Sequence, residues 1–349
     1  MKKLYIIVAI LISFGSLKAQ DFGSFLEGGE QIGSDLMQAY LEPAFTGFGY
    51  ALNSGWYNTA KPHKIAGFDI TVGASFALVP SSAELFDPSG INGIGVSPSE
   101  TGKTLAPTLR GDNLDADDIP YLVFNEGTDA TDDDISITSP TGIGIAETVV
   151  GFNAVPAPVV QIGFGLIKNT EIKLRLVPEQ TFDIDGNEGS TKLFGIGVMH
   201  DIKQWIPGMS KLPFDLSVFG AYSKMTTTYQ LDADSPDQIG NFEVTGTTFQ
   251  LAISKKLSIL TLYGGVGFSS SKVNFSLDGK YFLSSNETKD LAEQDQVADF
   301  IDPINLEYDA SGFRAKAGLR LKLLIVTVHA EYVVQEYNTF NTGIGISIR

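Results

Sequence analysis

Lysine and arginine side chains recur at even spacings in two segments of the chain, with apolar side chains between them. The basic positions are Lys173, Arg175, Arg314, Lys316 and Arg320. At such spacings, side chains share one face of a β-strand. If that face lines the inside of a barrel, the cations converge there with His329 and Glu331, and rings of charge in a narrow pore select anions such as carboxylates or phosphates.

The same cations could instead have a structural role. Several positive charges in a confined space repel one another unless acidic groups lie among them. Glu171 and Glu331 are too few to balance them, so we expect further partners in an N-terminal segment that fills the barrel. The candidate acids of that segment are Glu27, Glu30, Asp35 and Glu42. The sequence leaves both roles open, and we favour the ionic lock over the anion path.

Residue types that perform catalysis or bind metals are sparse. There is no cysteine, and the three histidines, His63, His200 and His329, are scattered. Only His329 falls on a predicted inward-facing position, beside Glu331, where we expect a structural role. A hydrolase needs a nucleophile oriented by a base, and local spacing assembles no such pair. We therefore predict no enzyme, no catalytic residue, no cofactor and no metal site.

Acidic residues could still gather divalent cations at the surface. The stretch from Asp183 to Asn187 imitates the start of a calcium loop but lacks the glutamate at loop position twelve, so it predicts a turn. The triplet Asp132 to Asp134 and the cluster from Asp112 to Asp118 could bind such ions, although we favour a merely solvated acidic loop.

The negative charge of the chain is concentrated in two segments. The formal net charge is −17, yet Pro80 to Pro156 alone carries 13 acidic and two basic residues, and Asp278 to Ala310 carries nine acidic and two basic residues. The rest of the chain is therefore nearly neutral. Nucleic acid is excluded as a partner because its recognition needs a basic face.

The first residues have the composition of a secretory signal peptide. Lys2 and Lys3 precede an apolar run from Leu4 to Phe14, and Ala19 stands at the expected cleavage point. The apolar run is too short to span a bilayer as a helix. We therefore assign residues 1–19 to a signal peptide and expect the mature protein to lie beyond the inner membrane.

Most of the remaining chain alternates between apolar and polar residues with a period of two. Phe313 to Leu323 shows it most clearly, because every second residue is apolar and the residues between are Arg314, Lys316, Gly318, Arg320 and Lys322. Ten strands can be counted. They lie at 68–78, 160–166 and 172–176, at 214–223, from 313 onward, and near residues 194, 247, 260, 326 and 344.

The connections between these strands alternate between short turns and long loops. Tight turns lie at 168–169, at 255–257 and around residue 324, with a longer member at 200–212. The long loops are 80–156, 177–191, 228–243 and 278–310, and only 336–339 is short on that side. Bacterial outer-membrane barrels are built in this way. We predict an all-β transmembrane antiparallel barrel over residues 65–349, with 10 strands counted and 10–14 allowed.

Residues 20–64 differ in character from the strands. Gln31 to Leu41 places its apolar residues near one helical face and precedes Pro43, where we expect the helix to end. Glycine and aromatic residues follow up to Tyr57. We predict a helical plug that fills the barrel or caps its periplasmic mouth.

Three stretches resemble an uncharacterised family of Bacteroidota outer-membrane proteins. They are LEPAFTGFGYALNSGWYNTAKPHKIAGFDITVGASF from Leu41, PAPVVQIGFGLIKNTEIKLRLVP from Pro156 and HDIKQWIPGMSKLPFDLSV from His200. More remotely, Trp56, Tyr57 and Asn58 before the first strand resemble the plug-closing element of the fatty-acid-transporter family of outer-membrane barrels. Thr59 stands where that element has proline, and ten strands are fewer than the fourteen that this family implies.

Two functions remain open at this point. The transporter resemblance implies a plugged, porin-like pore in the cell outer membrane for uptake of small hydrophobic or amphipathic molecules. The alternative is a non-conducting structural, assembly or surface-interaction protein. In both cases the expected partners are outer-membrane lipid and lipopolysaccharide, and the acidic loops could also gather divalent cations. A continuous cavity in the lumen favours transport, and a lumen filled with side chains favours the alternative.

Overall fold

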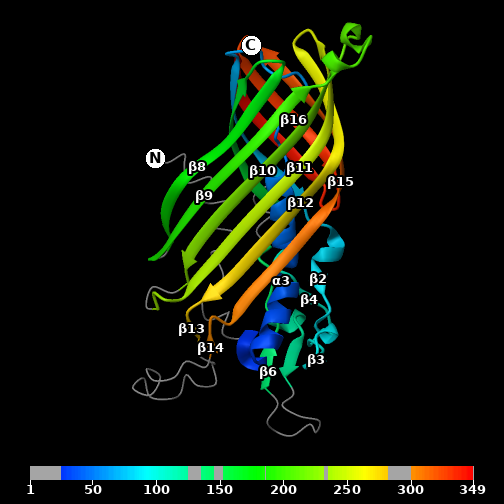
Figure 1. Cartoon of the computed structure of the whole chain (residues 1–349). Coiled ribbons are helices and arrows are strands. Elements are labelled where there is room, and N and C mark those ends of the chain that lie inside the picture. The colour runs from blue at the N-terminus through cyan, green and yellow to red at the C-terminus, as the bar shows by residue number, and fades with distance from the viewer. Residues whose placement is uncertain are drawn as a thin grey trace.

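Ten antiparallel strands close into a barrel (Figure 1). The computed structural model describes residues 25–124, 135–144, 152–184, 186–231, 235–281 and 300–348. The barrel strands are β1 (Phe68–Leu78), β7 (Ala154–Gly165), β8 (Thr170–Ile184), β9 (Asn187–Asp201), β10 (Asp215–Gln230), β11 (Ile239–Leu257), β12 (Leu260–Asp278), β15 (Ile304–Leu323), β16 (Val326–Val334) and β17 (Thr339–Ile348). The predicted ten-stranded barrel is confirmed, while the predicted signal peptide lies outside the described residues.

The barrel closes through its first and last strands. β1 pairs with β17 from Phe68 opposite Ile348 to Ala77 opposite Thr339. Pairing of the terminal strands removes the free edges that an open sheet would expose. We call the end that holds the tight turns at Lys168, Ser258 and Leu324 the turn end, and the opposite end the loop end.

Outward-facing apolar side chains form a belt that begins at the turn end. On β15 the exposed Leu323, Leu321, Leu319 and Phe313 belong to it. Farther toward the loop end, the same face of β15 carries Ser311, Asp309, Glu307 and Asn305. The alternating pattern therefore extends along the whole strand, but only the half next to the turns has an apolar exterior.

Aromatic side chains mark the border of the belt toward the loop end. Phe249 lies opposite Phe268, which lies opposite Phe313, and the last two rings are 5.7 Å apart. Phe340 lies opposite both Tyr332 and Phe76. These six residues form an aromatic girdle, as is typical of barrels that face lipid.

The strands are longer at the loop end than the sequence suggested. β8 and β9 occupy most of the predicted loop 177–191, and β10 and β11 occupy half of 228–243. β15 begins at Ile304 and β7 at Ala154, inside the two predicted acidic loops. The reason is an apolar inner face, because Leu306 and Tyr308 are buried there against the N-terminal helix.

One α-helix, α3 (Glu30–Leu52), runs inside the barrel (Figure 1). The prediction that it ends before Pro43 is wrong, since Pro43 lies within the helix. Tertiary packing offsets the usual cost of an internal proline. The Phe45 ring lies 4.9 Å from Phe242 and 5.3 Å from Tyr308, so the helix continues where the barrel encloses it.

The described residues between β1 and β7 form a small folded unit beside the N-terminal half of α3 (Figure 1). It contains β2 (Leu85–Phe86) paired with β4 (Ala106–Pro107), and a sheet of β3 (Ile94–Ser97), β5 (Tyr121–Phe124) and β6 (Ile135–Thr138). We call the described residues 80–124 and 135–144 the loop unit. The Tyr40 hydroxyl donates to the Thr141 carbonyl, and the Leu109 N–H donates to the Tyr40 carbonyl. The unit is thereby fixed to the helix.

Among the described residues, the helices do not include one that is long and apolar enough to cross a membrane.

Candidate functional site

All seven predicted lumen residues lie inside the barrel and are buried. Lys173 and Arg175 come from β8, and Arg314, Lys316 and Arg320 from β15, whereas His329 and Glu331 come from β16. The alternation of the strands turns each of these side chains inward while the neighbouring apolar side chains face outward. The inward cations therefore do converge, and what they contact decides their role.

Each predicted plug residue contacts one predicted lumen residue. The Arg175 guanidinium lies 3.9 Å from the centre of the Trp56 ring, and the Lys316 ammonium lies 3.4 Å from the centre of the Tyr57 ring. Asn58 Nδ2 is 3.5 Å from His329 Nδ1. A cation and the aromatic ring that it faces attract each other more strongly when both are removed from water. These pairs therefore join the segment to the wall.

Two arginines hold the C-terminal end of α3, and we call this pair the arginine clamp. Arg175 donates to the carbonyl oxygens of Leu52, at 2.8 Å, and of Ser54, at 2.6 Å. Arg314 donates to the Asn53 carbonyl at 3.0 Å and to Ser54 Oγ at 2.8 Å. A helix leaves its last carbonyls without intrahelical donors and carries partial negative charge at this end. The clamp supplies donors to these carbonyls and places positive charge beside the negative end of the helix.

The rest of the segment is also held through its main chain. Lys316 donates to the Tyr57 carbonyl at 3.3 Å, and Ser217 Oγ donates to the Ala60 carbonyl at 2.6 Å. The Ala60 N–H in turn donates to Ser254 Oγ at 3.0 Å. Wall side chains thus bind the backbone of the segment from the end of the helix to the turn end.

The expected ionic lock has different partners from those predicted. Glu30, Asp35 and Glu42 are exposed, and the clamp arginines bind main-chain carbonyls instead of these acids. The physical reason is distance. Asp35 and Leu52 are 17 residues apart in one helix, which at about 1.5 Å per residue separates them by about 25 Å. The acids lie toward the loop end, and the cations lie at the other end of α3.

The carboxylates that pair with lumen lysines come from the strands. Lys316 Nζ is 2.9 Å from Glu331 Oε2, and Lys173 Nζ is 2.5 Å from Glu171 Oε1 and 3.6 Å from Asp69 Oδ1. All five groups are buried. Because removal of one partner from a buried ion pair leaves an uncompensated charge, these pairs fix the positions of the surrounding side chains.

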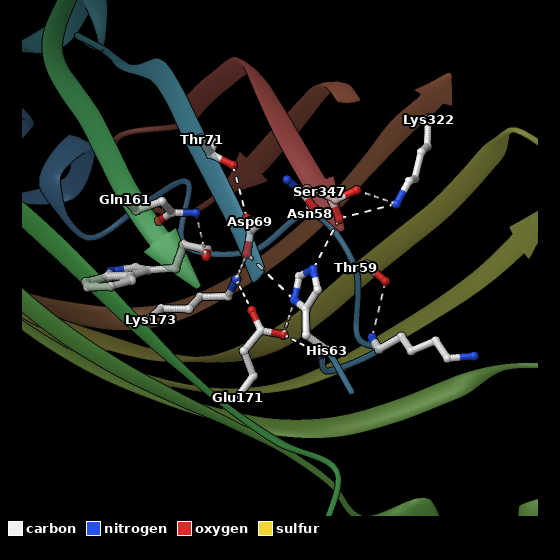
Figure 2. A network of polar contacts seen from close by, with 12 residues as sticks. Asn58, Thr59, His63, Asp69, Thr71, Gln161, Glu171, Lys173, Lys322 and Ser347 are labelled. Carbon is white, nitrogen blue, oxygen red and sulfur yellow. Dashed lines mark hydrogen bonds and ion pairs between the residues drawn. The ribbon is translucent and has the colours of Figure 1, made fainter. Parts of the chain in front are cut away.

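A second network lies near the turn end and is centred on His63, which sequence reasoning did not place in the lumen (Figure 2). Its Nδ1 is 2.9 Å from Glu171 Oε2, its Nε2 is 3.1 Å from Ser347 Oγ, and its N–H donates to Glu171 Oε2. His63 follows Pro62 outside any strand, so periodicity gave no signal. Its partners Glu171 and Asp69 lie on β8 and β1, where the alternation of the strands turns both side chains inward.

The contacts of His63 imitate two kinds of chemical site. Ser347, His63 and Glu171 have the hydrogen bonds of a nucleophile, a base and an orienting acid, but Ser347 is 1% exposed and a substrate would not reach its hydroxyl. Ligand atoms of His63, Asp69 and Glu171 lie within 4.8 Å of one another. Lys173 contacts both carboxylates, so an ammonium already supplies the positive charge. In this conformation the network anchors the segment.

The acidic groups proposed to gather divalent cations are described only in part. Residues 132–134 lie outside the described residues, as does residue 185. Asp183 Oδ1 accepts from the Gly186 N–H, as in a turn. Asp118 is engaged by Thr101, at 2.7 Å, and by Lys103, at 3.1 Å. The hydrogen bond from Thr101 and the nearby Lys103 ammonium lower the pKa of the Asp118 carboxyl, so this acid already has partners.

The barrel resembles solved barrels at low sequence identity. The protein Ail of Yersinia pestis has 12% identity and a TM-score of 0.26, with 51% of this chain and 95% of that chain covered. The translocator domain of the autotransporter NalP from Neisseria meningitidis has 11% identity and a TM-score of 0.27, with 82% of this chain and 90% of that chain covered. A Pseudomonas aeruginosa FadL homologue has 10% identity and a TM-score of 0.28, with 84% of this chain and 67% of that chain covered.

The comparison with curated proteins finds no match. Sequence comparison with family models is more informative. The model described as a family of unknown function (DUF6588) matches residues 1–348, and the chain therefore belongs to this family.

Proposed function

We propose that the protein is an outer-membrane β-barrel that its own N-terminal segment keeps closed and that presents the loop unit at the cell surface. One observation carries this proposal, namely a lumen filled with side chains at the level of the arginine clamp. Trp56, Arg175 and Arg314 are among the largest fully buried side chains of the described chain. A filled interior was the expected sign of a non-conducting barrel.

The dimensions of the belt support placement in a membrane. On β15 the belt runs from Phe313 of the aromatic girdle to Leu323, which is eleven residues. A tilted strand needs about 9–11 residues to cross the hydrocarbon core. The belt and the aromatic girdle therefore match one bilayer, and the loop-end parts of β8 to β12 and of β15 project beyond it.

The proposed orientation places the loop end outside the cell, because long loops of such barrels are extracellular. The N-terminal segment then runs through the lumen from outside to inside. α3 begins at Glu30 beside the loop unit, and the segment reaches Ser347 near the turn end through His63 (Figure 1). The segment is thus a plug along the whole barrel, and not a cap on the periplasmic mouth alone.

Single cysteines test this path, because the chain has none of its own. We expect Glu30→Cys to react with a membrane-impermeant maleimide on intact cells, and Lys64→Cys to react only after the outer membrane is opened. Both residues are exposed, so reactivity reports the side of the membrane. Labelling of Lys64→Cys but not Glu30→Cys on intact cells would show that the barrel has the opposite orientation.

Heating tests whether the isolated barrel is closed. Strand pairing around the full circumference resists detergent until the sample is boiled, because unfolding must break the pairing of a whole strand at once. We expect the unheated protein to run faster than the heated protein on a denaturing gel. Identical migration of the two samples would count against a closed barrel.

A second candidate function is gated uptake of small hydrophobic or amphipathic molecules. The β7–β8 seam favours it, since only Gln161–Gly165 of β7 pair with Glu171–Arg175 of β8, whereas both described strands continue toward the loop end. Pro156, Pro158 and Pro178 lie in the parts of β7 and β8 that do not pair across this seam. Proline has no N–H to donate. Uptake requires the plug to move, and the clamp variant described in the Discussion tests whether it can.

A further inference from the structure

The turn end of the barrel carries a ring of lysines. The exposed lysines of this end that have no ion-pair partner among the described residues are Lys64, Lys168, Lys211, Lys255 and Lys256. The acidic side chains of this end that reach the surface are Asp201 and Asp215, both partly buried. The turn end is therefore basic, although the chain as a whole carries a net charge of −17.

Apolar side chains stand between these lysines. They are Ile65, Ile167, Trp205, Ile259 and Leu324, each at least half exposed. Leu324 is the most exposed at 93%, and its φ of 55° lies in the left-handed region that ordinarily favours glycine or asparagine. A turn in contact with water alone would gain nothing from leucine at this position. We call these five lysines and five apolar residues the crown.

The belt is continuous with the crown. Leu323, Leu324, Ile325 and Val326 are all exposed and carry the apolar surface around the turn without a polar break. Counted from the aromatic girdle, the 9–11 residues needed to cross the hydrocarbon end at the turns themselves. The turns therefore lie at the height of the lipid headgroups, where lysines reach the phosphates while apolar neighbours stay in the acyl region.

We propose that the crown binds anionic phospholipid headgroups of the leaflet at the turn end. This inference rests on the proposed membrane placement and adds the lipid class. Attraction between the five lysines and negatively charged phosphates enriches anionic lipid around the turns, and the apolar crown residues hold the lysines at that depth. The acidic loop end repels anionic phospholipid. The two ends of the barrel therefore interact with such lipid in opposite ways.

Tryptophan fluorescence provides a local probe. The chain has two tryptophans; Trp56 is buried in the lumen, and Trp205 is 63% exposed in the crown. The folded protein is reconstituted into phosphatidylcholine vesicles in which about one fifth of the lipid carries brominated acyl chains, either as phosphatidylglycerol or as phosphatidylcholine. We expect brominated phosphatidylglycerol to quench Trp205 several-fold more than the same fraction of brominated phosphatidylcholine.

Replacement of the five crown lysines by Gln should make the two lipids quench equally. The matched control changes Lys192, Lys224 and Lys272 to Gln, because these lysines lie on the outer face toward the loop end, and it should keep the preference. High salt should weaken the preference in the wild-type protein.

The possible failures are distinguishable. Equal quenching by both lipids in the wild-type protein overturns the lipid preference while leaving the membrane barrel intact. Absence of quenching by either lipid, with heat-dependent migration preserved, places the crown in water and overturns the inference in favour of a protein-facing surface. Loss of heat-dependent migration contradicts the proposed function itself.

Discussion

Replacement of both clamp arginines by Gln is expected to turn a closed barrel into a conducting one. Arg175 and Arg314 together make four hydrogen bonds to residues 52–54, and a hydrogen bond to a charged group contributes about 1.5–3 kcal/mol. Loss of only about 1.4 kcal/mol changes an equilibrium tenfold. In planar bilayers the Arg175→Gln, Arg314→Gln protein should therefore spend at least ten times as long in conducting states as the wild-type protein.

The control removes two positive charges without touching the lumen. Lys224 and Lys272 form ion pairs with Glu243 and Glu307 on the outer surface, and such exposed pairs contribute little. Their change to Gln should leave the conductance at the wild-type level. Heat-dependent migration shows whether each variant still folds. A folded clamp variant that stays silent would show that the plug does not depend on the arginines, and with it the gated-uptake function would lose its support.

The clamp variant also separates the two candidate functions. If the opened barrel admits an amphipathic solute that the wild-type protein excludes, plug movement is sufficient for uptake. If it passes only ions and uptake is absent in both proteins, the surface role stands.

Replacement of Leu319 by Arg is expected to destabilise the folded barrel by about 2–4 kcal/mol, the cost of a cation near the middle of the bilayer. Leu319 faces outward on β15, is 52% exposed, and lies between Phe313 of the girdle and Leu323 at the turn. The free energy of unfolding in lipid vesicles, measured by denaturant titration, checks the value.

The same strand offers a matched control. Ser311 shares the outward face of β15 but lies beyond the girdle, where the neighbouring outward residues are polar, so Ser311→Arg should change the free energy of unfolding by less than about 0.5 kcal/mol. Gly318 is unsuitable, because a Cβ there would overlap the Tyr263 ring. Equal costs for Leu319→Arg and Ser311→Arg would mean that the belt does not lie in hydrocarbon.

Residue alternation alone is enough to predict the barrel. Strand periodicity, the number of strands and the inward direction of the lumen cations all follow from the alternation of residues such as Arg314 and Lys316 with Ala315 and Ala317. Strand ends were less well determined, because a residue such as Tyr308 becomes an inner-face residue only when the helix packs against it.

The groups that the lumen cations bind become visible only in the folded chain. Arg175 binds the Leu52 carbonyl 123 residues away in the chain, and Arg314 binds the Asn53 carbonyl 261 residues away. Every residue has a carbonyl oxygen, so a main-chain acceptor leaves no trace in residue types, whereas the acids of α3 are visible and misleading. His63 escaped prediction for a related reason, since a side chain outside regular structure has no periodic direction until the folded chain places it between Glu171 and Ser347.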